Sequence, residues 1–514
     1  MPASLWELRA DRAEPAYSTE PLDALASARP LDVLVVGGGL TGLSTALLLA
    51  EAGRRVAVVE SRLLGAGTTG RSTAKLSLLQ GTHLQQVERL HGTKALRQYV
   101  AAHRAGQEWA AQVAEAEGVP LQRRPAVTYA NGAAGARRLR RELAAAERAG
   151  LPVRWSEDTE LPFGVAGSIW LDGQLQTDPL ALVAALADRC RRLGVPLVER
   201  ARVTALRDRS PVQVDVAPAP HGRAEADAVR TLEAQQVVLA TNVPLLDRGG
   251  FFARMAPQRS YSVAFTLPAQ RVTDLPRGMY LSADAPSRSV RDAGSEDGSP
   301  VLLVGGDGHT TGRSRPTSQH LDSIRSWTRE HYPGATEQVA WSAQDFSPHH
   351  ALPYAGPLVP GNGRILVAGG FSKWGMTGGV AAALALAGDL AGGAPDWRDL
   401  LQPWSRRELK GLPTSARLNA EVAAAMTLGW AGAAARRCGL RKDAVGATSP
   451  PPGGAPVCTH LGGVLSWNDA ERSWDCPLHG SRFGADGGVL DGPAVRDLVP
   501  PAESDGATPG PTAG

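Results

Sequence analysis

The chain has 514 residues, which is more than one ordinary domain holds, so two or three folded units are expected. Its 54 lysines and arginines against 51 aspartates and glutamates leave a net charge of +3 without a run of one sign, which argues against a nucleic-acid-binding surface. Four cysteines exclude a disulfide-rich scaffold and favour a reducing compartment. No apolar segment has the pattern of a signal peptide or a membrane span, so we expect a cytoplasmic protein without a transmembrane segment.

The first predicted elements have the order strand, helix, strand. After an irregular leader over residues 1–30, an apolar strand at 31–36 leads into a glycine turn. A helix at 40–52 and a strand at 55–59 follow. This order is typical of the opening of a parallel α/β sheet.

Helices and buried strands alternate in the middle of the chain. Apolar side chains at helical spacing predict a helix at 95–117. A capping Asp178, a first-turn proline and a terminal glycine bound another helix at 179–193. A strand with an internal turn is predicted at 195–206 and a buried strand at 235–240.

The second half has a different pattern. Residues 257–345 alternate short strands with turns rich in proline, glycine and serine, which favours an antiparallel sheet. An apolar strand at 365–370 precedes a helix of small residues at 376–390. An alanine-rich helix at 419–437 is then followed by a stiff, proline-rich linker at 446–456.

Three glycines follow the first strand at the spacing of a dinucleotide-binding turn. Gly37, Gly39 and Gly42 allow a tight turn and bring backbone N–H groups to a pyrophosphate at the positive end of a helix. Glu60 ends the next strand, where its carboxylate can accept hydrogen bonds from ribose hydroxyls. The alternative is a structural glycine turn with a solvated Glu60. We expect dinucleotide binding, and no second glycine fingerprint of the kind that a nicotinamide reductase needs is present.

Five blocks resemble the D-amino acid oxidase-like family of FAD-dependent oxidoreductases. They are VVGGGLTGLSTALLLAEAG at 35–53, GAGTTGRSTAKLSLLQG at 65–81, VVLATN at 237–242, PYAGPL at 353–358 and GRILVAGGFSKWGMTGG at 363–379. The resemblance covers about residues 31–395. It implies FAD lying extended across a discontinuous, Rossmann-type α/β domain, with an antiparallel α+β substrate domain over the flavin ring.

The same resemblance implies which residues contact FAD. Arg71, Ser72 and Thr73 offer donors in one loop, although Arg71 reads equally well as a surface arginine. Gly369 and Gly370 precede a helix whose N-terminal amides would favour negative charge on the reduced flavin. No cysteine lies near this block, so we expect FAD to be bound non-covalently. The whole implied set is Gly37, Gly39, Gly42, Glu60, Arg71, Ser72, Thr73, Val203, Thr241, Gly369, Gly370, Met376 and Thr377.

Near the C-terminus, two short loops each carry a cysteine and a histidine. Cys458-Thr-His460 and Cys476-Pro-Leu-His479 supply two thiolates and two imidazoles, the ligand set of a Rieske [2Fe–2S] centre. A Cys₂His₂ zinc site is the alternative, but finger-type sites group the cysteines together and the histidines together. CTHLGG, CPLHGSRF and DGPA resemble the Rieske ferredoxin family over residues 456–498.

This region also departs from respiratory Rieske proteins. Gly463 and Leu478 stand where the resemblance implies a second cysteine pair, so no disulfide can join the two loops. Ser481 keeps a hydroxyl for a cluster sulfide, whereas Phe483 replaces a tyrosine donor. A helix and a linker stand where further strands are expected, so the base sheet of the module is predicted to be shortened.

The expected architecture is an α/β FAD domain, an antiparallel α+β substrate domain and a small all-β Rieske module. The expected boundaries are a leader at 1–30, an oxidoreductase at 31–400 (FAD-binding segments at about 31–90, 177–250 and 350–400; substrate domain at about 91–176 and 251–349), a helix and linker at 401–457, the Rieske module at 458–498 and a disordered tail at 499–514.

The resemblance implies oxidation of a C–N bond in an amine or amino acid, with hydride transfer to the flavin. His309 and Lys373 are the candidate catalytic residues, and Tyr261 and Trp374 are candidate walls. An ordinary loop histidine and a solvated lysine are the alternatives for the first two. Flavin takes two electrons and a Rieske cluster passes one at a time, so the acceptor would be a one-electron carrier protein or a quinone. The alternative function is an oxidase that uses O₂ and carries a C-terminal module without a redox role.

Overall fold

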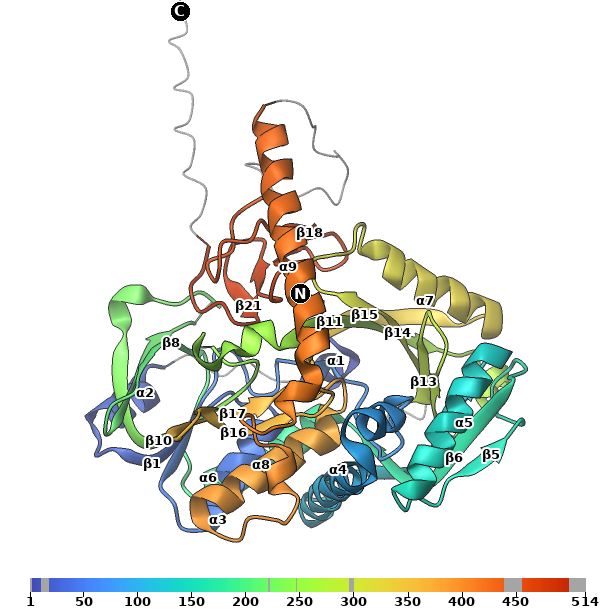
Figure 1. Cartoon of the computed structure of the whole chain (residues 1–514), viewed down its shortest axis with the longest axis horizontal. Helices are drawn as coiled ribbons and strands as arrows, with labels where there is room; N and C mark the ends of the chain where they lie inside the picture. The colour runs from blue at the N-terminus through green and yellow to red at the C-terminus, as the bar shows by residue number, and fades with distance from the viewer. Residues whose placement is uncertain are drawn as a thin grey trace, which may run out of the picture.

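The computed structural model describes residues 2–10, 18–220, 222–245, 247–294, 300–438 and 455–498. Three β-sheets organise these residues (Figure 1). The sheet with β1 (Leu31–Val36) lies on the left of the view and the sheet with β14 (Val301–Thr310) on the right. The small C-terminal sheet lies above both, beside the upright helix α9 (Glu408–Arg437).

The first sheet has eight strands and is parallel at its centre. β1 pairs with β2 (Val56–Val59) on one side and with β10 (Arg230–Asn242) on the other, and β10 pairs with β17 (Asn362–Gly369). The other strands are β7 (Leu197–Val198), β8 (Ala201–Arg207), β9 (Val212–Pro218) and β16 (Tyr354–Val359). Parallel strands end at a common edge, so the turn after β1 meets the ends of β2 and β10.

Four helices pack with this sheet around one large core: α3 (Leu40–Glu51), α4 (His83–Ala116), α6 (Pro179–Arg192) and α8 (Gly375–Ala391). Small residues allow close approach between them. A Cβ at Gly106 of α4 would lie 2.2 Å from the carbonyl oxygen of Thr377 in α8. The structure confirms the helices predicted at 40–52, 179–193 and 376–390. The helix predicted at 95–117 begins earlier, at His83, because the chain continues as helix across a break at Gly92 (φ +82).

The second sheet has nine strands, and every neighbouring pair is antiparallel except β12 with β4. In sheet order the strands are β15 (Thr336–Pro348), β11 (Met255–Thr266), β14, β13 (Arg288–Asp292), β12 (Met279–Ser282), β4 (Leu121–Ala130), β6 (Gly167–Thr177) and β3 (Lys75–Leu76), with β5 (Arg154–Ser156) against β6. Helices α5 (Ala133–Arg148) and α7 (Ser318–His331) pack against it.

Two sequence predictions are wrong in detail. Residues 257–345 do not form only short strands, because β11 has 12 residues, β15 has 13, and α7 lies between β14 and β15. Pro257, Ser260, Ser262 and Ser342 lie inside these long strands rather than in turns, and they pair there with neighbouring strands. The leader is not irregular throughout, since it contains α1 (Leu5–Arg9) and α2 (Glu20–Ser27). A capping box between Ser4 and Glu7 starts α1.

The C-terminal module, residues 455–498, is a four-stranded antiparallel sheet of β18 (Ser466–Asn468), β19 (Ser473–Asp475), β20 (Arg482–Gly484) and β21 (Val489–Asp491). Val422, Ala425 and Met426 of α9 pack against its core. α9 begins at Glu408, earlier than predicted, and it packs against the short sheet. Most of the predicted linker and the predicted tail lie outside the described residues.

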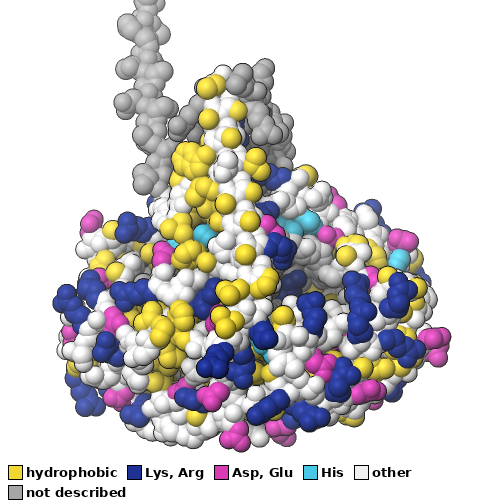
Figure 2. Space-filling model, in the orientation of Figure 1, with side chains coloured by type: hydrophobic (Ala, Val, Ile, Leu, Met, Phe, Trp, Pro, Cys, Tyr) yellow, Lys and Arg dark blue, Asp and Glu magenta, His cyan; other side chains and the backbone are white. Residues whose placement is uncertain are grey.

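Figure 2 shows apolar side chains along α9, which include Leu409, Leu412, Leu428 and Trp430. None of the helices in the described part of the chain is long and apolar enough to cross a membrane.

Candidate functional site

The glycine turn after β1 and the carboxylate at the end of β2 form one hydrogen-bonded unit. Gly37 has φ +108, and a Cβ there would lie 2.6 Å from the carbonyl oxygen of Ala240. A Cβ at Gly42 would lie 1.9 Å from the carbonyl oxygen of Gly37. Only glycine fits these two positions. The Gly38 amide donates to the Glu60 carboxylate at 2.7 Å, which fixes that carboxylate beside the turn.

A cavity of about 210 Å³ borders this turn. Seven of the residues that were predicted to contact FAD line it, namely Gly37, Gly39, Glu60, Ser72, Val203, Thr241 and Met376. Arg71 and Thr73 line a neighbouring cavity instead. Gly42 lies behind the turn, and Gly369, Gly370 and Thr377 line neither cavity.

The neighbouring cavity has a volume of about 580 Å³ and is bounded mainly by the second sheet and the start of α8. Five residues line both cavities, namely Thr68, Ser72, Asp345, Lys373 and Met376. The predicted walls Tyr261 and Trp374 line the second one. A long cofactor that starts at the glycine turn would therefore reach a chamber large enough for a small-molecule substrate.

Arg71 lies buried beside the larger cavity, so the surface alternative is wrong. Its side chain is 8% exposed, and its Nη2 lies 3.2 Å from the Glu7 carboxylate in α1. Its Nε and Nη1 atoms have no hydrogen-bond partner in the described part of the chain. Buried donors without partners favour an oxygen-rich ligand beside them. This arrangement fits the phosphate or carbonyl oxygens of FAD.

Asp345 is a site residue that the sequence did not reveal. It lies in β15, where no motif marks it. Its carboxylate accepts the backbone amides of Phe346, at 2.7 Å, and of Lys373, and burial raises its pKa. Lys373 faces both cavities, and exclusion of bulk water by the surrounding protein lowers the pKa of its amine. Two titratable groups thus stand where the cavities meet.

Lys75 is the second residue that sequence reasoning missed. It lines the larger cavity, where its Nζ lies 3.0 Å from the carbonyl oxygen of Tyr280 and 2.5 Å from Ser289 Oγ. Burial and the neighbouring Arg291 lower its pKa to about 7. The small number of lysines in the sequence could have indicated this residue. Only five of the 54 basic residues are lysines, and two of them, Lys75 and Lys373, line this cavity.

His309 lines neither of the two cavities. Its Nε2 lies 3.1 Å from the Tyr261 hydroxyl and its Nδ1 2.9 Å from the carbonyl oxygen of Thr310. The ring also stacks on His320 at 4.4 Å. Burial lowers its pKa to about 4. The geometry places His309 in a packed aromatic cluster beside the cavity wall.

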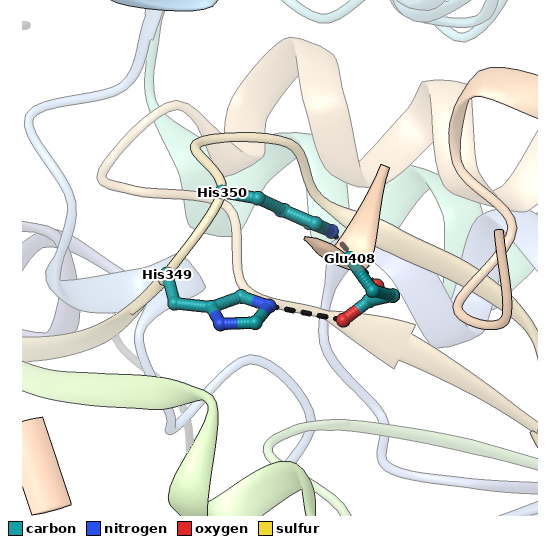
Figure 3. Close-up of side chains that lie close together, drawn as sticks. All are labelled: His349, His350 and Glu408. Carbon is teal, nitrogen blue, oxygen red and sulfur yellow. Dashed lines mark hydrogen bonds and ion pairs between the residues drawn. The ribbon is translucent and has the colours of Figure 1, made fainter. Parts of the chain in front are cut away.

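His349 and His350 both point at Glu408 in the first turn of α9 (Figure 3). Their Nε2 atoms lie 2.9 and 3.0 Å from the two carboxylate oxygens. Two histidines and a glutamate are a common set of metal ligands. Here Arg254 also binds the same carboxylate, at 2.8 Å, and its positive charge opposes a metal ion. We interpret the group as an anchor that fixes the start of α9.

The two cysteines predicted as metal ligands lie together in the module. Cys458 and Cys476 are buried, and their thiols hydrogen-bond to each other. The Cys458 sulfur also accepts hydrogen bonds from the His460 amide and the Ser481 hydroxyl. These donors stabilise negative charge, so the pKa of Cys458 is lowered. Thiolate is the form that binds iron.

The two imidazoles lie beside the thiols. The rings of His460 and His479 are 5.4 Å apart, and Phe252 contacts both. The Nε2 atom of His460 lies 2.5 Å from the Asp247 carboxylate, an arrangement that commonly orients metal-bound histidines. The Nδ1 atom of His479 is buried without a partner in the described residues, and burial lowers its pKa to about 4. Neutral imidazole is the metal-binding form, so the four residues fit a Rieske cluster.

Buried charges hold the module against the second sheet. Arg259 of β11 is fully buried and contacts the Glu471 carboxylate of the module. Arg482 also binds Glu471, at 2.7 Å, and Asp475, at 3.1 Å. Loss of one partner would leave a buried charge uncompensated, so this network holds the module in one position.

Comparisons with known proteins agree with both sites. The family model described as FAD dependent oxidoreductase matches residues 32–388, and the Rieske [2Fe-2S] domain model matches residues 454–502. YhfW of Bacillus subtilis (strain 168), provisionally named a Rieske 2Fe-2S iron-sulfur protein, is 28% identical over 489 residues, which are 91% of this chain and 92% of YhfW. The cytochrome b6-f complex iron-sulfur subunit of Synechococcus sp. (strain JA-3-3Ab) is 55% identical over 42 residues, 8% of this chain and 24% of that protein.

Solved structures resemble the larger part of the fold. L-proline dehydrogenase from P. horikoshii has a TM-score of 0.58 at 17% identity and covers 73% of this chain and 97% of its own. Glycine oxidase from Geobacillus kaustophilus has a TM-score of 0.58 at 21% identity, with coverages of 72% and 96%. Together with the glycine turn, its cavity and the four convergent ligands, the two family-model matches show that the chain belongs to the FAD-dependent oxidoreductase family, carries a C-terminal Rieske domain, and binds FAD and a [2Fe–2S] cluster.

Proposed function

We propose that the protein oxidises a C–N bond of an amine or amino acid and passes the electrons singly through its Rieske cluster to an external carrier protein or quinone. When bound, FAD supplies the hydride acceptor and the cluster supplies one-electron transfer. The proposal rests on the positions of two consecutive residues in β15. Gln344 contacts a ligand loop of the module, and the next residue, Asp345, lines both cavities.

The proposed FAD site comprises the thirteen residues that the family resemblance implies. Those that line the two cavities, Arg71 included, would contact FAD directly. Gly42, Gly369, Gly370 and Thr377 would support the turn and the start of α8 from behind. Cys458, His460, Cys476 and His479 are the proposed iron ligands.

The larger cavity supports an amine or amino acid as substrate. Its volume of about 580 Å³ suits a small molecule, and serine, glutamine and lysine side chains contribute to its wall. L-proline dehydrogenase and glycine oxidase, two proteins with the same fold, are named for amino acid substrates. The same substrate class is therefore the proposal for this chain.

Lys75 is the group that we assign to proton transfer. A substrate amine must lose its ammonium proton before hydride can leave the adjacent carbon, because the nitrogen lone pair forms the C=N bond. With a pKa of about 7, the Lys75 amine is neutral in part of the population at neutral pH and can accept that proton at Nζ. Lys373 and Asp345 would orient the substrate where the two cavities meet.

Electron paramagnetic resonance of the dithionite-reduced protein tests the proposal. We expect a Rieske signal together with two irons and two sulfides per chain, and loss of the signal in Cys476→Ser. One zinc per chain, or the absence of an EPR signal in both the oxidised and the reduced protein, would contradict electron transfer through the cluster. That result would favour an oxidase that delivers electrons to O₂, and peroxide formed during turnover would identify it.

A further inference from the structure

We propose that residues 489–495 of the Rieske module form the outer wall of the FAD site over the adenosine half of the cofactor, so that tight FAD binding requires the docked module. Six residues of this segment line the same cavity as the glycine turn, namely Val489, Leu490, Asp491, Gly492, Ala494 and Val495. This role of the segment in FAD binding does not depend on the path of the electrons.

Hydrogen bonds place the wall segment next to the ribose end of the cavity. Glu60 is the carboxylate suited to ribose hydroxyls, and it is close enough to Arg202 to interact with it electrostatically. The Arg202 Nη2 atom donates to the carbonyl oxygen of Val489 at 2.8 Å. Arg202 also lines the cavity and is 5% exposed. The segment thus begins beside the expected ribose site rather than beside the flavin ring.

Asp497 holds the segment in this position. Its Oδ1 atom accepts Arg202 Nη1 at 2.7 Å and the Val489 amide at 2.8 Å. Its Oδ2 atom accepts the Ala224 amide, in the connection between β9 and β10, at 2.9 Å. One carboxylate therefore joins the module to two segments of the first sheet.

The opposite side of the segment touches a ligand loop. The Ala494 amide donates to Ser481 Oγ at 3.2 Å, and the Ser481 hydroxyl in turn bonds to the Cys458 sulfur. A Cβ at Gly492, which has φ +88, would lie 2.5 Å from the carbonyl oxygen of Gly480. The segment is packed between the FAD cavity and the cluster, so it cannot leave the cavity unless the module moves.

The first test measures FAD affinity in the full-length protein. FAD is removed, the cluster is retained, and the apoprotein is titrated with FAD while flavin fluorescence is followed. The double variant Leu490→Ala/Val495→Ala removes apolar wall atoms, so we expect the dissociation constant to rise about tenfold. The Rieske signal of the same sample shows that the module is folded.

Asp469→Ala is the matched control. Asp469 Oδ1 accepts the Thr317 amide at 2.7 Å and joins the module to the start of α7, and it does not line the FAD cavity. We expect wild-type FAD affinity in this variant. An unchanged dissociation constant in the double variant would overturn the proposal.

Hydrogen exchange of the unaltered protein is a second test, and it stays informative if the double variant loses its cluster. Backbone amides of residues 489–495 should exchange more slowly after FAD is added to the cluster-containing apoprotein. Equal exchange rates with and without FAD would show that the segment does not cover the cofactor.

Discussion

Gln344 and Asp345 are consecutive residues of β15 that belong to different sites. The Nε2 atom of Gln344 donates to the carbonyl oxygen of Gly480 in a ligand loop at 2.8 Å, whereas Asp345 lines the two cavities. Adjacent side chains in a strand point to opposite faces. At this point a single β-strand lies between a ligand loop of the module and the cavities, and the fold brings the two cofactor sites together.

Gln344→Ala should destabilise the docking of the module. The side chain also accepts Thr311 Oγ1 at 2.7 Å, so its removal leaves the buried Gly480 carbonyl and a hydroxyl without partners. We expect a loss of about 1–3 kcal/mol in the free energy of unfolding. Urea unfolding followed by cluster absorbance measures it. Gln338→Ala is the control, because Gln338 lies exposed in the same strand and should change stability by less than about 0.5 kcal/mol.

Gly42→Ala should abolish FAD binding. The added Cβ would lie 1.9 Å from the carbonyl oxygen of Gly37, so the turn must move away from the pyrophosphate position. The measurement is the flavin content of purified protein, with circular dichroism to verify folding. Gly132→Ala serves as a control, since a Cβ there meets nothing within 4 Å. A folded Gly42→Ala variant that is as yellow as wild type would refute the assigned turn.

The amine of Lys75 should titrate near neutral pH. Its pKa is lowered to about 7 by burial and Arg291, so it is protonated below that pH and neutral above it. NMR of lysine-labelled protein can resolve it, because the chain has only five lysines. We expect one resonance to titrate near pH 7 and to vanish in Lys75→Arg. If all five lysine side chains titrated above pH 9, Lys75 would not be the proton acceptor.

The lowered pKa of Lys75 also predicts how the rate of flavin reduction depends on pH, once a substrate is found. Anaerobic flavin reduction should become faster as the pH rises through about 7, because the neutral form of Lys75 accepts the proton. Lys75→Met should lose this rise. A variant that keeps the wild-type profile would show that another group titrates.

The flavin should be released by acid. Among the described cysteines, none lines either cavity, so no thioether link to the flavin ring is expected. Acid precipitation should leave the yellow colour in the supernatant. A yellow pellet would indicate a covalent bond through another side chain.

The local parts of the sites were predictable from the sequence. The turn of Gly37, Gly39 and Gly42 and the carboxylate of Glu60 depend on spacing within one strand–helix–strand unit, which sequence patterns record directly. The convergence of Cys458 and Cys476 depends on two short loops in the same way.

Long-range pairing explains what the sequence could not reveal. Asp345 reaches the cavities only because β15 pairs with β11 across the second sheet, and Lys75 because β3 joins β6. His309 was a candidate catalytic residue, but the pairing of β14 with β11 places its ring against Tyr261. The contact of residues 489–495 with the FAD cavity joins two domains, so no local pattern contains it.

The proposed function requires that electrons from the flavin reach the Rieske cluster. Anaerobic photoreduction with EDTA and light reduces bound flavin without any substrate, and electron paramagnetic resonance then reports the cluster. We expect the Rieske signal to grow as the flavin absorbance bleaches. In Cys458→Ser the flavin should bleach without the appearance of that signal. Fully bleached flavin beside a cluster that stays oxidised until dithionite is added would contradict this electron transfer.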